Sequence, residues 1–94
     1  MYERVVRFTD VSAERIEQLV ARINEAGGPP PGVKTSGLRL LFDASQGTGV
    51  AIQEFATAEN MAEAAKVFAA MDTSETPGTR VSVDECEVKL DLKP

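Results

Sequence analysis

The segment Val5–Ile23, VVRFTDVSAERIEQLVARI, joins the pattern of a β-strand to that of an amphipathic helix. Its helical part carries apolar residues at the i, i+3, i+4, i+7 spacing of a single helix face. These residues are Ile16, Leu19, Val20 and Ile23. Ser12 stands just before this part as an N-cap, because its hydroxyl can accept a hydrogen bond from a free amide of the first turn. The segment therefore predicts a strand that leads into a helix.

The second half of the chain repeats this unit. A strand at Thr48–Ala56 precedes a helix with Thr57 as its N-cap. The apolar positions of that helix are Met61, Ala64, Ala65 and Phe68. Two further strands are predicted, at Gly37–Asp43 and at Arg80–Leu92. The first of them is expected to form a hairpin with the strand at Thr48–Ala56.

The resulting order of elements, β-α-β-β-α-β, is that of an α+β, ferredoxin-like fold. We expect residues 1–94 to form a single domain. Its four-stranded antiparallel sheet would have the strands in the order fourth, first, third, second, with both helices on one face. Phe68 of the second helix and Leu40 of the second strand are predicted core residues.

Composition excludes several classes of partner. The chain has 94 residues and a net charge of −5, and its ten Lys and Arg residues are scattered. Such a chain is expected to bind nucleic acid poorly, because that binding depends on clustered cations. It is expected to bind an anionic membrane poorly for the same reason. It has no apolar run of about 18 residues and no recognisable signal peptide. We therefore expect a cytoplasmic protein that binds neither nucleic acid nor membrane.

The residue types available for catalysis or cofactor binding are few. The chain has no histidine, which removes Ser–His and Cys–His pairs and histidine metal or haem ligands. Its single cysteine, Cys86, lies between two glutamates and is predicted to be a buried apolar residue rather than a reactive thiol. Gly27–Thr35, GGPPPGVKT, has only a superficial likeness to a phosphate-binding loop, because its prolines lack amide donors. We expect no cofactor, metal or nucleotide.

The two faces of the predicted sheet differ in polarity. The face expected under the helices carries Val6, Phe8, Leu38, Leu40, Phe42, Val50 and Ile52. The opposite face is expected to carry Val5, Arg7, Arg39, Leu41, Ala51, Gln53 and Phe55. Because that second face is too apolar for water and too polar for a dry core, we expect a homodimer that encloses a partly polar cavity.

Arg7, Arg39 and Gln53 are the candidate ligand-binding residues. If they line one cavity, they could hold an anionic or enolate oxygen. They could equally form ion pairs between subunits or point into solvent. No catalytic residue is assigned.

A family resemblance rests on Gln53–Ala64, QEFATAENMAEA. In this segment Phe55, Thr57, Glu59 and Met61 stand as the aromatic, cap, acid and apolar anchor of a pattern found in the dimeric α+β barrel superfamily. The chain resembles that superfamily, which includes the antibiotic-biosynthesis monooxygenase-like proteins. The resemblance implies a homodimer whose sheets face each other. Many members carry a histidine on the second helix, near the position where this chain has Ala64.

Two functions follow as hypotheses. The first is a small dimeric module that is non-catalytic, or that binds a small molecule in a cavity between sheet and helices or between subunits. The second is a cofactor-independent monooxygenase or isomerase acting on an aromatic or enolisable compound, which would need oxyanion donors in a dry cavity.

Overall fold

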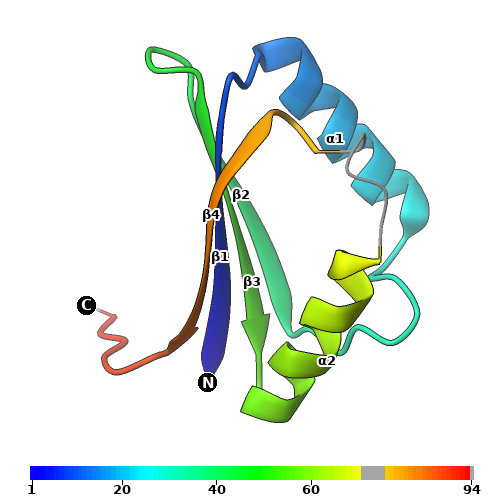
Figure 1. The fold of residues 1–94 in the computed structure, drawn as a ribbon, viewed down its shortest axis with the longest axis vertical. Helices are drawn as coiled ribbons and strands as arrows, with labels where there is room; N and C mark the ends of the chain where they lie inside the picture. The colour runs from blue at the N-terminus through cyan, green and yellow to red at the C-terminus, as the bar shows by residue number, and fades with distance from the viewer. Residues whose placement is uncertain (71–75, 94) are drawn as a thin grey trace.

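A computed structural model describes residues 1–70 and 76–93 of the chain (Figure 1). The elements are β1 (Tyr2–Thr9), α1 (Ala13–Ala26), β2 (Gly37–Asp43), β3 (Thr48–Phe55), α2 (Ala58–Ala69) and β4 (Thr79–Glu87). The strands form one antiparallel sheet in the order β2-β3-β1-β4. The predicted ferredoxin-like α+β fold and strand order are confirmed.

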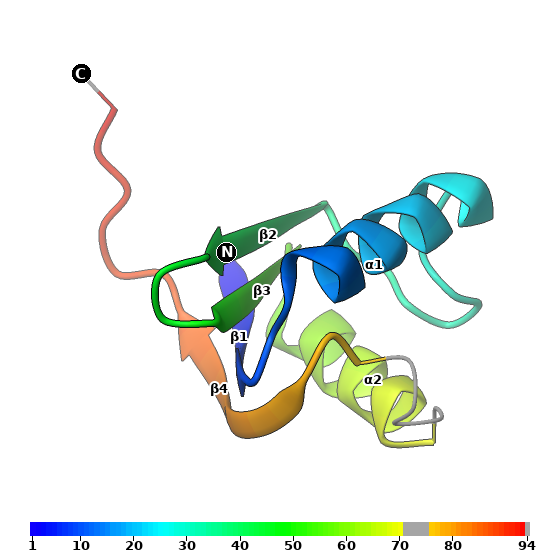
Figure 2. The same cartoon turned by 90° about the horizontal axis from the view of Figure 1, so that it is seen from above.

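Both helices cover the same face of the sheet. Figures 1 and 2 show α1 and α2 on one side, and no described helix on the other. We call the side without helices the open face. Its residues, which alternate with those under the helices, are Glu3, Val5, Arg7, Arg39, Leu41, Val50, Ile52, Glu54, Ser82, Asp84 and Cys86.

Each helix begins at its predicted cap. The Ser12 hydroxyl accepts a hydrogen bond from the amide of Arg15 at 3.2 Å, and the Thr57 hydroxyl accepts one from the amide of Asn60 at 3.0 Å. Gly27 ends α1 in the left-handed conformation (φ 71°), which a glycine adopts without steric cost.

The predicted face assignment is wrong for β3. The register pairs Gln53 with Arg4, and Ala51 with Val6, so these residues lie under the helices. Ile52 pairs with Val5 on the open face. Both parities of β3 contain apolar residues, so alternation did not distinguish them. Phe55, assigned to the open face from sequence, is instead fully buried (0% exposed).

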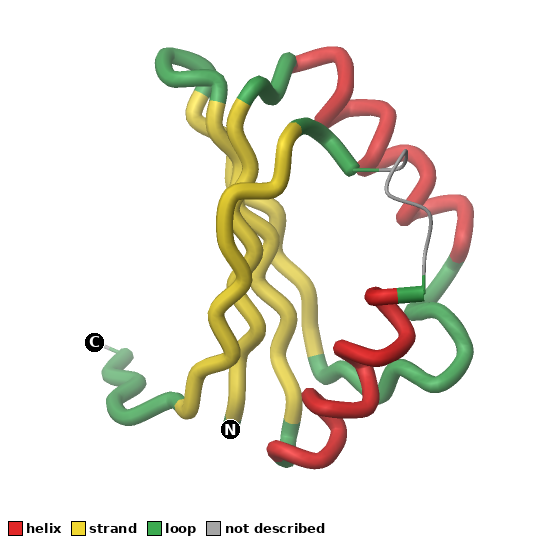
Figure 3. Tube along the Cα trace, in the orientation of Figure 1, coloured by secondary structure: helices red, strands yellow, loops and turns green. Residues whose placement is uncertain are grey.

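The last strand is shorter than predicted. β4 ends at Glu87, and residues 88–93 leave the sheet as an irregular tail (Figure 3). The register between β1 and β4 shifts so that Val81 is the extra residue of a β-bulge. Cys86 pairs with Glu3 on the open face and is exposed, which corrects the prediction that it is buried.

The core divides into two small clusters. One joins β3 to α2 through Phe55, Met61 and Ala64, with Val33 of the α1–β2 connection beside them. The other lies under the start of α1 and contains Val6, Phe8 and Val11. Phe68 and Leu40, the predicted core residues, are half-buried. The most completely buried apolar residues, Phe55 and Ala64, therefore lie at the contact of α2 with β3.

No helix among residues 1–70 and 76–93 is long and apolar enough to cross a membrane.

Candidate functional site

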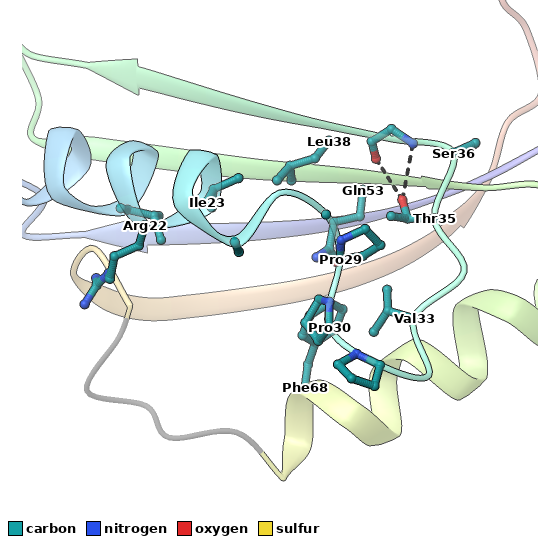
Figure 4. A pocket seen from close by; sticks show the side chains of 15 residues that line it. Arg22, Ile23, Pro29, Pro30, Val33, Thr35, Ser36, Leu38, Gln53 and Phe68 are labelled. Atoms are coloured by element: carbon teal, nitrogen blue, oxygen red, sulfur yellow. Dashed lines mark hydrogen bonds between the residues drawn. The ribbon is translucent and has the colours of Figure 1, made fainter.

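A cavity of about 780 Å³ lies between α1, the connection that follows it, and the sheet (Figure 4). We call it the α1 cavity. Its described lining residues are Leu19, Arg22, Ile23, Ala26, Gly28, Pro29, Pro30, Pro31, Val33, Thr35, Ser36, Gly37, Leu38, Gln53 and Phe68. Its volume lies within the range of pockets that take small organic ligands.

The cavity exists because α1 does not pack closely on the sheet. None of the residues of α1, all of which the structure describes, is buried. Leu19 and Ile23, on its apolar face, are half-exposed and line the cavity. Across the space, Leu38 of β2 is 42% exposed although it belongs to the face under the helices. Apolar side chains on both walls are therefore left without full contact.

The proline connector, residues 27–36, forms the end wall of the cavity. Gly32 adopts a positive φ of 88°, and a Cβ there would lie 3.3 Å from a methyl of Val67, so the connector approaches α2 closely. Val33 is buried in the α2 core. The Thr35 hydroxyl lies 2.7 Å from the Glu54 carbonyl oxygen, which ties the end of the connector to β3. These contacts fix a wall that also has three stiff prolines.

The lining is mainly apolar with a few polar groups. In Figure 4, Ile23 and Leu38 lie on one side and Val33 and Phe68 on the other, with Gln53 between them. Arg22 is the only titratable side chain among the described lining residues. The described lining thus offers no carboxylate, thiol or imidazole as a general base.

A buried arginine lies beside this cavity. Arg4 of β1 is 8% exposed, and its guanidinium donates to Gln53 Oε1 at 3.2 Å. The guanidinium carbon lies 4.9 Å from the ring centroid of Phe68, in cation–π contact. Gln53 and Phe68 both line the cavity, so Arg4 stands directly behind its wall. Burial lowers the pKa of Arg4 from its usual value, and the nearby charge of Glu85 acts in the opposite direction.

The three candidate ligand-binding residues are not brought together. Arg7 and Arg39 lie on the open face, where they pair with Val50 and Ile52 respectively. Gln53 lies on the other face and lines the α1 cavity. The sheet therefore separates the two arginines from the amide.

Sequence reasoning missed Arg4 and the role of the proline connector. Arg4 comes one residue before the predicted first strand, and its strand parity matches that of Val6 and Phe8. That parity was a usable signal, because a charged residue on a buried strand face is uncommon. From the sequence, the prolines serve only as an argument against a phosphate-binding loop.

Residues 1–70 and 76–93 contain no group of three Cys, Asp or Glu side chains that could hold a metal ion. In comparisons with known proteins, no family model, no curated protein and no solved structure matched the chain.

Proposed function

We propose that this protein binds a small, largely apolar molecule in the α1 cavity. The observation that carries the proposal is a cavity of about 780 Å³ with apolar walls on three elements, α1, the proline connector and β2. Contact between apolar walls and water is unfavourable, and a bound apolar molecule would replace that water. The lining has few polar groups. They could orient a bound molecule, but they are too few to bind a strongly polar one.

Binding is favoured over catalysis. A cofactor-independent monooxygenase or isomerase must remove a proton from its substrate, and the described lining supplies no carboxylate, imidazole or thiol for that step. The enzyme hypothesis remains the second candidate.

Nile red, a neutral apolar dye, tests the proposal through its fluorescence. The wild-type protein should bind it at micromolar concentration, and Ile23→Trp should weaken binding about tenfold or more by filling the cavity. Val20→Trp is the matched control, since Val20 lies on the same helix, is 41% exposed and does not line the cavity. Absence of dye binding to the wild type, or equal binding by both variants and the wild type, would contradict the proposal.

We also propose that the open face is covered by a second copy of this chain. Its centre is apolar, with Val5, Val50 and Ile52 side by side and Leu41 47% exposed. This arrangement agrees with the resemblance to the dimeric α+β barrel superfamily, which stays a prediction.

The charges of the open face favour a self-complementary arrangement. Arg39, Ile52, Val5 and Asp84 form one row across β2, β3, β1 and β4. A two-fold axis parallel to the strands would lay β2 over β4 of the partner subunit. Arg39 would then face Asp84 of the partner subunit, at both edges of the interface. A two-fold axis in the plane of the sheet but perpendicular to the strands would instead lay β2 over β2 of the partner subunit and bring the two copies of Arg39 together.

Sedimentation velocity over a range of micromolar concentrations tests the dimer. Leu41→Glu should weaken it, because it buries an unpaired carboxylate in each subunit. Arg39→Asp should also weaken it, and the charge swap Arg39→Asp with Asp84→Arg should restore it. Val20→Glu is the control on another surface. A wild-type monomer at every concentration would overturn the dimer, and a charge swap that fails to rescue would overturn the strand-parallel axis.

A further inference from the structure

Arg4 is a buried cation that forms no ion pair with any residue of 1–70 or 76–93. The only ion pair within residues 1–70 and 76–93 joins Lys89 to Glu87, so no described carboxylate lies within 4.0 Å of the Arg4 nitrogens. Its Nε is buried and has no hydrogen-bond partner. Glu85 is the cross-strand neighbour of Arg4 on β4, but its side chain is exposed and makes no ion pair with it. Burying an unpaired guanidinium is costly.

Gln53 connects Arg4 to the cavity, because it accepts from Arg4 and lines the cavity. Arg4 is only a donor, so the amide oxygen of Gln53 must face it, and the hydrogen bond of 3.2 Å fixes that orientation. The amide NH₂ of Gln53 is then left to donate on the other side. No described residue accepts from it within hydrogen-bond distance, and Gln53 lines the cavity. One of the donors at the cavity is thus an amide whose oxygen accepts from a buried cation.

We infer that the ligand of the α1 cavity is an amphipathic carboxylate, with its anionic end at Gln53, behind which Arg4 lies, and its apolar body along Ile23, Leu38 and the prolines. This inference rests on the proposed binding function and adds the chemical class of the ligand. The carboxylate accepts from the Gln53 amide and adds a negative charge near Arg4, which forms no ion pair with the described residues. Hydrogen bonds with a charged partner are about twice as strong as neutral ones, so the anionic end would set specificity while the apolar body would supply most of the buried area.

Competition with Nile red tests the carboxylate. Decanoate and methyl decanoate have nearly the same apolar body, and hydrocinnamate and its methyl ester form a second pair with an aromatic body. At neutral pH each acid should displace the dye about tenfold more effectively than its ester. The pair with the higher affinity identifies the body as aliphatic or aromatic.

Two variants locate the effect. Arg4→Met keeps an unbranched side chain for packing on Phe68 and should abolish the preference for acid over ester while dye binding remains. Gln53→Leu should reduce the preference for acid over ester. This second variant keeps the test valid if Arg4→Met does not fold. Arg7→Met is the matched control, because Arg7 lies on the same strand and on the open face. It should leave the preference unchanged.

The outcomes separate the inference from the proposed function. Dye binding with equal displacement by acid and ester would overturn the carboxylate and leave the apolar cavity site intact. A preference for acids that persists in both Arg4→Met and Gln53→Leu would overturn the assignment to these residues. If the wild type does not bind the dye, the proposed function itself fails.

Discussion

The two helices have similar sequence patterns but differ in their contacts with the sheet. Each begins at a hydroxyl cap and carries an apolar face. α2 buries Met61 and Ala64 against Phe55, whereas no residue of α1, a fully described helix, is buried. The apolar face of α2 includes two alanines, Ala64 and Ala65, which allow close approach. That of α1 carries larger side chains and is followed by the proline connector. One helix therefore contributes most of the buried contacts with the sheet, and the other leaves the α1 cavity beside it.

The largest effect is expected at the contact of α2 with the sheet. Phe55→Ala should lower the free energy of unfolding by about 3–5 kcal/mol, because Phe55 is fully buried and its removal leaves a cavity. The measurement is urea unfolding at constant protein concentration, with Val20→Ala in α1 as the control. A loss below about 1 kcal/mol would mean that α2 does not pack as described.

The same contact should reject a larger side chain. Ala64 is 0% exposed, so Ala64→Leu should cost about 1–3 kcal/mol by overpacking. Ala21→Leu makes the same change at an exposed position of α1 and should stay within about 0.5 kcal/mol of the wild type. Equal losses at the two positions would remove the distinction between the helices.

The order of elements was predictable because each element carries a local signal. The caps Ser12 and Thr57 and the glycine end of α1 act within one turn, so their residue types alone indicate the helix ends. The strand order followed from the pairing of consecutive strands and the right-handed crossovers of this fold.

The site was less predictable because it depends on the register and on the position of a helix. In β3, Val50 and Ile52 look more suited to a core than Ala51 and Gln53, yet the sheet has apolar residues on both faces. The connector that follows α1 approaches Val67 of α2 closely at Gly32, a contact between distant segments that no local pattern encodes. Gln53, one of the three candidates from sequence, lines the α1 cavity, whereas Arg7 and Arg39 lie on the opposite face of the sheet.

Removal of the caps compares the helices at matched positions. Thr57→Ala should lower the free energy of unfolding by about 1 kcal/mol. Ser12→Ala should affect global unfolding less and should chiefly speed the amide hydrogen exchange of α1, because a helix with few buried contacts can open locally. Equilibrium unfolding and hydrogen exchange measure the two effects. The comparison breaks if Ser12→Ala lowers the global free energy more than Thr57→Ala does.

The smallest effect is expected at the wall of the cavity. Leu19→Ala should cost about 1 kcal/mol or less, because the side chain is already half-exposed and leaves no new enclosed void. A buried leucine would cost about 2–5 kcal/mol under the same change. Urea unfolding measures the stability, and Nile red titration of the same variant reports whether the wall contributes to binding. If Leu19→Ala costs as much as a buried leucine, α1 packs tightly on the sheet in solution and the cavity is closed. If stability is nearly unchanged while dye affinity falls, Leu19 contributes to the ligand site rather than to the fold, as the position of α1 implies.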